Sequence, residues 1–190
     1  RLAADAGEFL SPGGRMGMLS NAWALLLADA IDGDDLLDTL RNLADDPDAN
    51  VISALLDQLG NIESNLLEPE LADEYAEFVR TLLSPALARI GTAPRDGESP
   101  DIQALRPRLM LKLADRGRDP VVREILAHEV QRYLDGEIPM SPIVSTGMET
   151  EAQRGDVARF ARYRAQLDRV ESPSERLAVL SAIGSFRELA

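Results

Sequence analysis

The sequence predicts an all-α protein, an α-solenoid in which antiparallel helix pairs stack one after another. Apolar residues recur at three- and four-residue spacings along most of the chain, and strand-like alternation appears nowhere. Turn residues separate about nine such segments, so that a helix pair takes roughly 35 to 40 residues. With 190 residues and 45% hydrophobic content, the chain can bury a sizeable core. We expect one helical-repeat domain over residues 1–190.

Four helices are predicted before residue 91. The first starts at Pro12-Gly13-Gly14, and the second follows the acidic turn DGDD at 32–35, whose carboxylates complement a helix dipole. The third runs from about residue 49 to 66 and the fourth lies within 68–90. The expected apolar side of the first helix consists of Met18, Leu19, Ala22, Trp23, Leu26 and Leu27. That of the fourth consists of Leu71, Tyr75, Phe78, Val79, Leu82 and Leu83.

Five helices are predicted after residue 101. They follow the polar segment 91–101, which is rich in Gly and Pro and is predicted to be an exposed loop. The first two lie within 102–117 and 119–136, and in the turn between them Asp119 caps and Pro120 takes the first helical position. A further helix begins near Ser141-Pro142, and the last two lie within 156–170 and 172–186.

The composition excludes several classes of function. With 33 Asp and Glu against 20 Lys and Arg, the net charge is −13, which repels nucleic acid and anionic membrane surfaces. No apolar run approaches the ~20 residues of a membrane span. The absence of cysteine excludes a disulfide scaffold and a thiolate zinc site. We expect a soluble protein whose compartment the sequence leaves open, with the cytoplasm favoured over export.

The stretch ILAHEVQRYLDG, residues 125–136, contains the first half of the zinc-peptidase signature His-Glu-x-x-His. Arg132 occupies the place of the second histidine and cannot bind a metal. His128 is the only histidine, so a metal site here would need carboxylates, which suit harder cations than zinc. We expect His128 to lie on a helix among polar neighbours, without a metal in this segment.

Other candidate residues also favour structural roles. Trp23 is expected in the core. The acidic stretch DGDDLLD lacks the ligand spacing of a calcium loop. A cluster of arginines could face a peptide carboxylate or an acidic patch of another domain, but a solvated helix face with acidic partners is favoured. Its members are Arg154, Arg159, Arg162, Arg164 and Arg169. We therefore name no catalytic, cofactor-binding or metal-binding residue.

Three segments, in this order, resemble one family. Arg15 followed by LSNAWALLLADAI resembles its first helix, and LRPRLMLKLADRGRDPVVREIL at 105–126 resembles a later hairpin. The segment 152–190 resembles one in which Gly-Asp precedes an aromatic helix and a Pro-Glu-Arg-like turn, although Phe160 replaces the usual Trp. The family is the C-terminal helical domain of zinc aminopeptidases related to aminopeptidase N and the endoplasmic-reticulum aminopeptidases, within the gluzincins.

The resemblance implies a bowl of HEAT-like helix pairs that covers the active site and confines the peptide substrate. Zinc and the catalytic residues would lie in an N-terminal catalytic domain of the same chain, outside these 190 residues. The segment alone is then not an enzyme, and its parent is a zinc-dependent aminopeptidase. We expect a truncated piece whose open solenoid end can associate with a second copy. The alternative is a free-standing helical-repeat scaffold that binds a protein partner.

Overall fold

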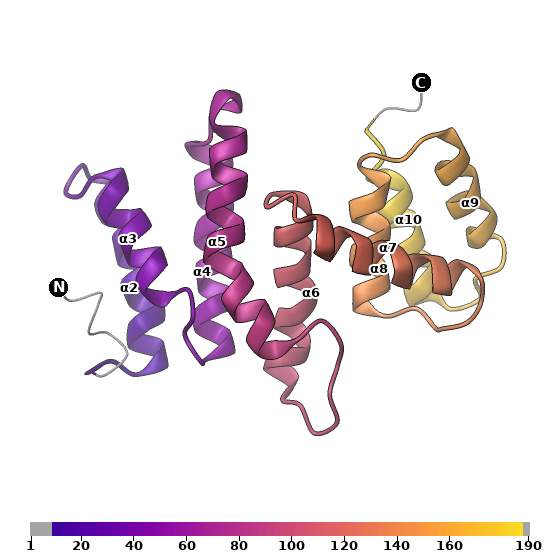
Figure 1. Ribbon diagram of the computed structural model, residues 1–190, viewed down its shortest axis with the longest axis horizontal. Coiled ribbons are helices and arrows are strands. Elements are labelled where there is room, and N and C mark those ends of the chain that lie inside the picture. Colours follow the sequence, from indigo (N-terminus) through magenta and orange to yellow (C-terminus); the bar gives the residue numbers. More distant parts are fainter. Residues whose placement is uncertain (1–8, 188–190) are drawn as a thin grey trace. The chain divides into compact units, whose positions relative to one another are not determined.

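The computed structural model describes residues 9–187, and in that range it contains nine α-helices, one short 3-10 helix and no strand (Figure 1). The all-α fold of helices packed in sequential pairs is therefore confirmed. The chain divides into two compact units, Arg1–Gly117 and Arg118–Ala190.

Unit 1 contains five α-helices. They are α2 (Pro12–Leu27), α3 (Gly33–Leu43), α4 (Ala49–Asn65), α5 (Ala72–Ile90) and α6 (Pro100–Asp115), with the 3-10 helix η1 (Pro69–Leu71) before α5. Consecutive helices pack as the pairs α2/α3 and α5/α6, and alternate helices stack, α2 on α4 and α4 on α6. Packing between near neighbours in the sequence is typical of an α-solenoid.

The helix starts of unit 1 follow from local capping chemistry. The hydroxyl of Ser11 accepts a hydrogen bond from the Gly14 N–H at 3.2 Å, and α2 begins at Pro12. At α3, the Asp32 carboxylate accepts from the Asp35 N–H, and the Asp35 side chain accepts in return from the Asp32 N–H. This capping box confirms that the acidic turn serves the start of a helix.

Two predicted apolar stripes were partly wrong. In α2 only Leu19 and Ala22 are buried apolar residues, whereas Trp23 is half-buried and Leu27 is 67% exposed. Within unit 1, α2 packs mainly on α3 and α4, and these two helices cover only part of its described surface. Leu71 is also exposed, because it lies in η1, before the register of α5 begins.

Buried ion pairs hold two inter-helix segments of unit 1 in place. The Arg15 guanidinium donates two hydrogen bonds to the Asp46 carboxylate, at 2.6 and 3.0 Å, and so ties α2 to the turn before α4. Arg106 of α6 is 1% exposed and donates to the Ile90 and Gly91 carbonyls and to the Glu98 carboxylate. The polar segment after α5 is therefore fastened to α6, although most of its residues are exposed as predicted.

Unit 2 contains four helices around its own core. They are α7 (Pro120–Leu134), α8 (Pro142–Ala152), α9 (Val157–Leu167) and α10 (Pro173–Gly184). The predicted cap is confirmed, since the Asp119 carboxylate accepts hydrogen bonds from the N–H groups of Val121 and Val122. Helix α8 packs on α7 and α10, and α9 packs on α10. The buried core consists of Val130, Tyr133, Val144, Met148, Ala152, Tyr163, Val170, Val179 and Ala182.

Close packing explains a glycine inside α8. A Cβ on Gly147 would lie 2.7 Å from Val130 Cγ2 and 2.9 Å from the Leu126 carbonyl oxygen of α7. The missing side chain thus lets the two helix backbones approach each other, and the helix forms despite the low helix propensity of Gly. Over the described residues, no helix is both long and apolar enough to cross a membrane.

Candidate functional site

All three tyrosines of the chain donate a hydrogen bond to a glutamate. The hydroxyl of Tyr75 lies 2.9 Å from Glu63, that of Tyr133 lies 2.7 Å from Glu175, and that of Tyr163 lies 3.0 Å from Glu151. Burial, reinforced by the nearby carboxylate, raises the pKa of each phenol above its ordinary value, and that of Tyr133 to about 12. Two of these contacts border pockets.

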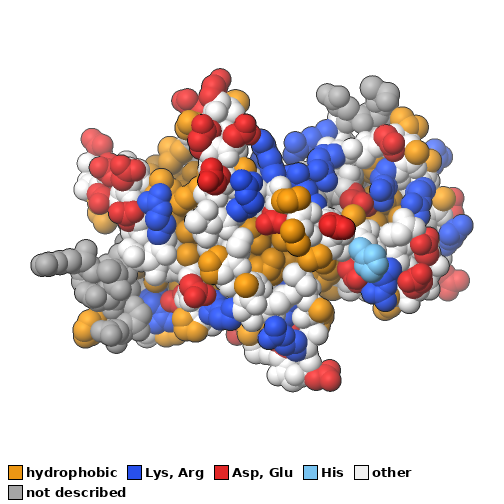
Figure 2. All heavy atoms as spheres, viewed as in Figure 1, with side chains coloured by type: hydrophobic (Ala, Val, Ile, Leu, Met, Phe, Trp, Pro, Cys, Tyr) orange, Lys and Arg blue, Asp and Glu red, His pale blue; other side chains and the backbone are white. Residues whose placement is uncertain are grey.

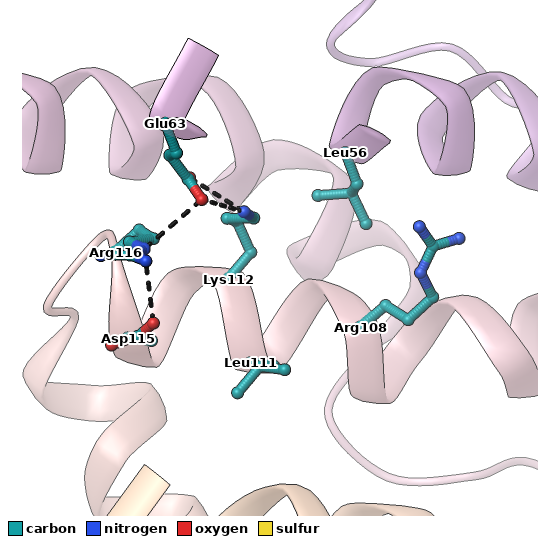
Figure 3. A pocket seen from close by; sticks show the side chains of 7 residues that line it. All are labelled: Leu56, Glu63, Arg108, Leu111, Lys112, Asp115 and Arg116. Carbon is teal, nitrogen blue, oxygen red and sulfur yellow. Dashed lines mark hydrogen bonds and ion pairs between the residues drawn. The ribbon is translucent and has the colours of Figure 1, made fainter. Parts of the chain in front are cut away.

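The first pocket lies in unit 1 between α4 and α6 (Figure 3). Lys112 Nζ lies 2.8 and 2.7 Å from the two Glu63 carboxylate oxygens, and Arg116 Nε lies 3.4 Å from one of them. Arg108 pairs with Asp57 at 2.6 Å. The pocket has a volume of about 330 Å³ and is lined by Leu56, Glu63, Arg108, Leu111, Lys112, Asp115 and Arg116. Each of its basic groups already has an acidic partner, so the arrangement serves first to join α4, α5 and α6.

The second pocket lies in unit 2 where α8 leads into α9. Its volume is about 390 Å³, and Glu151, Arg154, Gly155, Asp156 and Arg159 line it. Arg159 Nη1 lies 2.6 Å from Glu151 Oε2, the oxygen that also accepts from the Tyr163 hydroxyl. Asp156 caps α9 by accepting a hydrogen bond from the Arg159 N–H at 2.8 Å. We call this the α8–α9 pocket.

Burial and charge compete at Glu151. Burial raises the pKa of its carboxyl above the ordinary value, and the positive charges of Arg159, Arg162 and Arg154 lower it, with burial the larger effect. Arg162 is shared with α7, because its guanidinium lies 3.0 Å from Gln131 Oε1 and 3.7 Å from Asp135 Oδ1. Three guanidinium groups therefore act on one buried carboxylate.

The two tyrosine sites repeat one pattern that sequence analysis missed. In each, the glutamate precedes the tyrosine by 12 residues, as Glu63 precedes Tyr75 and Glu151 precedes Tyr163. In each, the hydroxyl also lies within 3.3 to 3.4 Å of a backbone carbonyl of the preceding helix, at Leu59 or Met148. The Glu-x11-Tyr spacing was the only signal in the sequence, and the residues between the two ends differ.

The candidate residues His128 and Trp23 lie on different helices. His128 lies on α7 with its side chain 69% exposed and Nδ1 3.5 Å from Glu129, which confirms a surface helix position. Trp23 is half-buried rather than in the core, because its side of α2 is only partly covered. Between residues 9 and 187, no group of three or more His, Cys, Asp or Glu side chains could hold a metal ion.

The five arginines of the predicted cluster have different surroundings in the structure. Arg159 and Arg162 have acidic partners, as predicted. Arg154, Arg164 and Arg169 are exposed, and their side chains form no ion pair with the rest of the described chain. Arg154 differs from the other two because it lines the α8–α9 pocket.

Charge is unevenly divided between the two units. Residues 1–117 contain 21 Asp and Glu against 10 Lys and Arg, a net charge of −11, whereas residues 118–190 contain 12 against 10, a net charge of −2. Figure 2 shows acidic side chains gathered at two tips of unit 1, over the turn between α2 and α3 and over the segment between α4 and α5. The negative charge of the chain is therefore concentrated in unit 1.

Comparison with known proteins defines the class of this helical domain. The whole chain, residues 1–190, matches the ERAP1-like C-terminal domain family, and the chain belongs to that family. Distant similarity also relates it to aminopeptidases M1-C and M1-D of Oryza sativa subsp. japonica, with 29% identity over 111 and 112 residues. These stretches cover 57% and 58% of this chain and 13% of each relative. The predicted resemblance is thus confirmed.

Proposed function

We propose that this chain is the non-catalytic C-terminal helical domain of a zinc-dependent M1 aminopeptidase. In this role it covers the active site of an N-terminal catalytic domain and confines the peptide whose N-terminal residues are removed. Zinc and the catalytic groups belong to that catalytic domain. The partners of the domain are then the catalytic domain of the same chain and the peptide substrate.

One observation carries the proposal, namely the family match along all 190 residues. The fold supports it, because stacked helix pairs form extended surfaces that can enclose an elongated ligand such as a peptide. The two related aminopeptidases support the activity of the parent protein, and the matched stretches are 13% of their length. The peptide-confining role is the part that experiment must test.

The first test compares this chain with the same chain extended N-terminally along its natural reading frame. Both are assayed for bound zinc and for hydrolysis of aminoacyl substrates. We expect stoichiometric zinc and activity in the extended protein alone. Hydrolysis by the 190-residue chain would overturn the proposal. If both proteins lack zinc and activity, the alternative replaces the proposal, namely a helical scaffold that binds a protein partner.

The second test addresses confinement directly. The extended protein is assayed on peptides that share an N-terminal sequence and differ only in length. If this domain confines the peptide, kcat/KM depends on peptide length, and removal of residues 1–190 abolishes that dependence while a single aminoacyl amide is still cleaved. Equal kcat/KM at every length in the extended protein would contradict confinement.

A further inference from the structure

The α8–α9 pocket combines a guanidinium that forms no ion pair with one whose hydrogen-bond donors are only partly used. The Arg154 side chain is exposed, lines the pocket and has no ion-pair partner in the described chain. Arg159 donates to Glu151 and also interacts with the Tyr163 hydroxyl, and a guanidinium carries five N–H donors, so part of its capacity remains. Two arginines therefore border one hollow, and both retain donors for an incoming anion.

The local charge has the opposite sign to that of the chain. Between residues 151 and 169 there are five arginines against three acidic residues, a net charge of +2 in a chain of net charge −13. Glu151 and Asp156 are the acids of the pocket itself, and both are engaged, Glu151 by Arg159 and Tyr163 and Asp156 by the start of α9. Arg154 is the pocket-lining arginine that has no ion pair with the described residues, so its charge is available to an anion in the pocket.

The backbone of the pocket is held by aromatic packing. A Cβ on Gly155 would lie 2.5 Å from Phe186 Cε1 and 3.2 Å from the Glu151 carbonyl oxygen. The Phe186 ring in turn packs edge-on against Phe160 and Tyr163, with ring centroids 5.3 and 5.8 Å apart. The segment that carries Arg154 is thus closely packed on one side, which reduces the ordering cost of binding a ligand.

We propose that the α8–α9 pocket binds side-chain carboxylates of an acidic peptide segment. Guanidinium groups bind carboxylates through paired, charge-assisted hydrogen bonds, and two arginines around one hollow suit adjacent Asp or Glu side chains. Electrostatic screening favours a short segment over nucleic acid. A carboxylate in the pocket feels mainly charges within about 8 Å, whereas an extended polyanion is repelled by the net charge of −13 of the chain.

The binding step can be tested on the 190-residue chain, and it does not depend on the proposed function. The probe is a fluorescent peptide with acetylated and amidated ends and consecutive Glu residues, so that only side-chain carboxylates are available. Its binding is followed by anisotropy at low and at physiological salt. We expect Arg154→Gln and Arg159→Gln each to weaken binding about tenfold, the loss of one charge-assisted contact. A peptide with Gln in place of Glu should not bind.

Two further variants sharpen the test. Arg132→Gln removes the same charge from unit 2 at a residue that pairs with Glu129 and Glu137 outside the pocket, so it should change binding by no more than about twofold. Glu151→Gln releases Arg159 from its ion pair and should strengthen binding, because the ligand then competes with no internal carboxylate. Urea midpoints of all variants show whether each one is folded.

Three results would overturn the proposal. The first is equal binding of the Glu and Gln peptides. The second is an Arg154→Gln protein that is folded and binds the Glu peptide as tightly as the parent chain. The third is a single-stranded oligonucleotide of equal charge that binds more tightly than the peptide and loses affinity on the same two substitutions, which would make the pocket a phosphate site.

Discussion

Tyrosine is the residue type whose role could least be predicted from the sequence. Tyr75 was expected on an apolar stripe, and it is buried, but its hydroxyl donates a hydrogen bond to Glu63 of α4. Tyr133 and Tyr163 make the same kind of contact from α7 and α9. A phenol buried beside a carboxylate ionises only at a high pH, since the phenolate would lose hydration and lie next to another negative charge.

This environment predicts an unusual tyrosine titration. In the folded chain, absorbance at 295 nm should show no ionisation step at the ordinary tyrosine pKa of 10, and Tyr133 should titrate first, near pH 12. In concentrated urea all three should ionise near pH 10. Because the folded pKa values are raised, the stability that depends on neutral phenols is complete below pH 10 and is lost as the pH rises further.

A native titration step near pH 10 with the amplitude of one or more tyrosines would contradict the described hydrogen bonds. Tyr133→Phe serves as the matched control. It leaves Glu175 without its phenol partner and should remove the signal near pH 12 without creating one at pH 10. Because the other two tyrosines contact different glutamates, their ionisation should not move.

At the scale of the helix, the starts of the helices could be predicted from the sequence. The distances at which neighbouring helices pack could not. Ser11, Asp32, Asp119 and Ser141 accept hydrogen bonds from N–H groups in the first turns of their helices, so local chemistry sets those starts. The weak helical character of residues 144–147 had a cause that only packing shows. At Gly147, the one glycine of α8, a Cβ would lie 2.7 Å from Val130 and 2.9 Å from the Leu126 carbonyl oxygen of α7.

Two glycine substitutions should therefore change stability in opposite directions. Gly147→Ala should lower the free energy of unfolding by about 1–3 kcal/mol, because the new methyl group overlaps Val130 and the α7 backbone. Gly60→Ala in α4 should raise it by about 0.5–1 kcal/mol, because its Cβ would meet nothing within 4 Å and alanine favours the helix. Urea denaturation of both variants measures the difference. Equal changes in the free energy of unfolding of the two variants would show that helix propensity, and not packing, determines the effect of these substitutions.

At the scale of the whole molecule, unit 2 has a hydrophobic core built from its own residues. The core of unit 2 is built from residues between Val130 and Ala182, all of which belong to that unit. The single tryptophan, Trp23, lies in unit 1 and is half-buried, so its fluorescence reports on that unit alone. The unfolding of a unit 2 core variant can therefore be followed by two signals, the helical circular dichroism of the whole chain and the Trp23 fluorescence of unit 1.

Met148→Ala should destabilise unit 2 by about 2–5 kcal/mol, because it removes a fully buried side chain. We expect part of the helical circular dichroism signal to be lost at lower urea, while the Trp23 transition keeps its midpoint. Val79→Ala, a fully buried change in unit 1, is the control and should shift the Trp23 transition. A common shift of both signals in Met148→Ala would show that the chain unfolds as one cooperative unit.

The charge asymmetry also belongs to this scale. Composition predicted an acidic protein that avoids polyanions, and the division into units places nearly all of the excess negative charge in residues 1–117. The arginine cluster was expected to be a solvated face, and for Arg159 and Arg162 the acidic partners are present. Arg154 could not be distinguished from its neighbours by sequence, because only folding brings it to the edge of the α8–α9 pocket.

The sequence by itself determined the all-α class, the order of the helices over residues 9–187, most of their starts and the family, because periodicity, caps and turn residues act over a few positions. Only the tertiary structure decided which apolar stripes are covered, as the exposed Leu27 and the half-buried Trp23 show. It also decided the pairing of Arg15 with Asp46 and of Tyr163 with Glu151. Such contacts join residues on different elements, and their partners depend on how those elements pack.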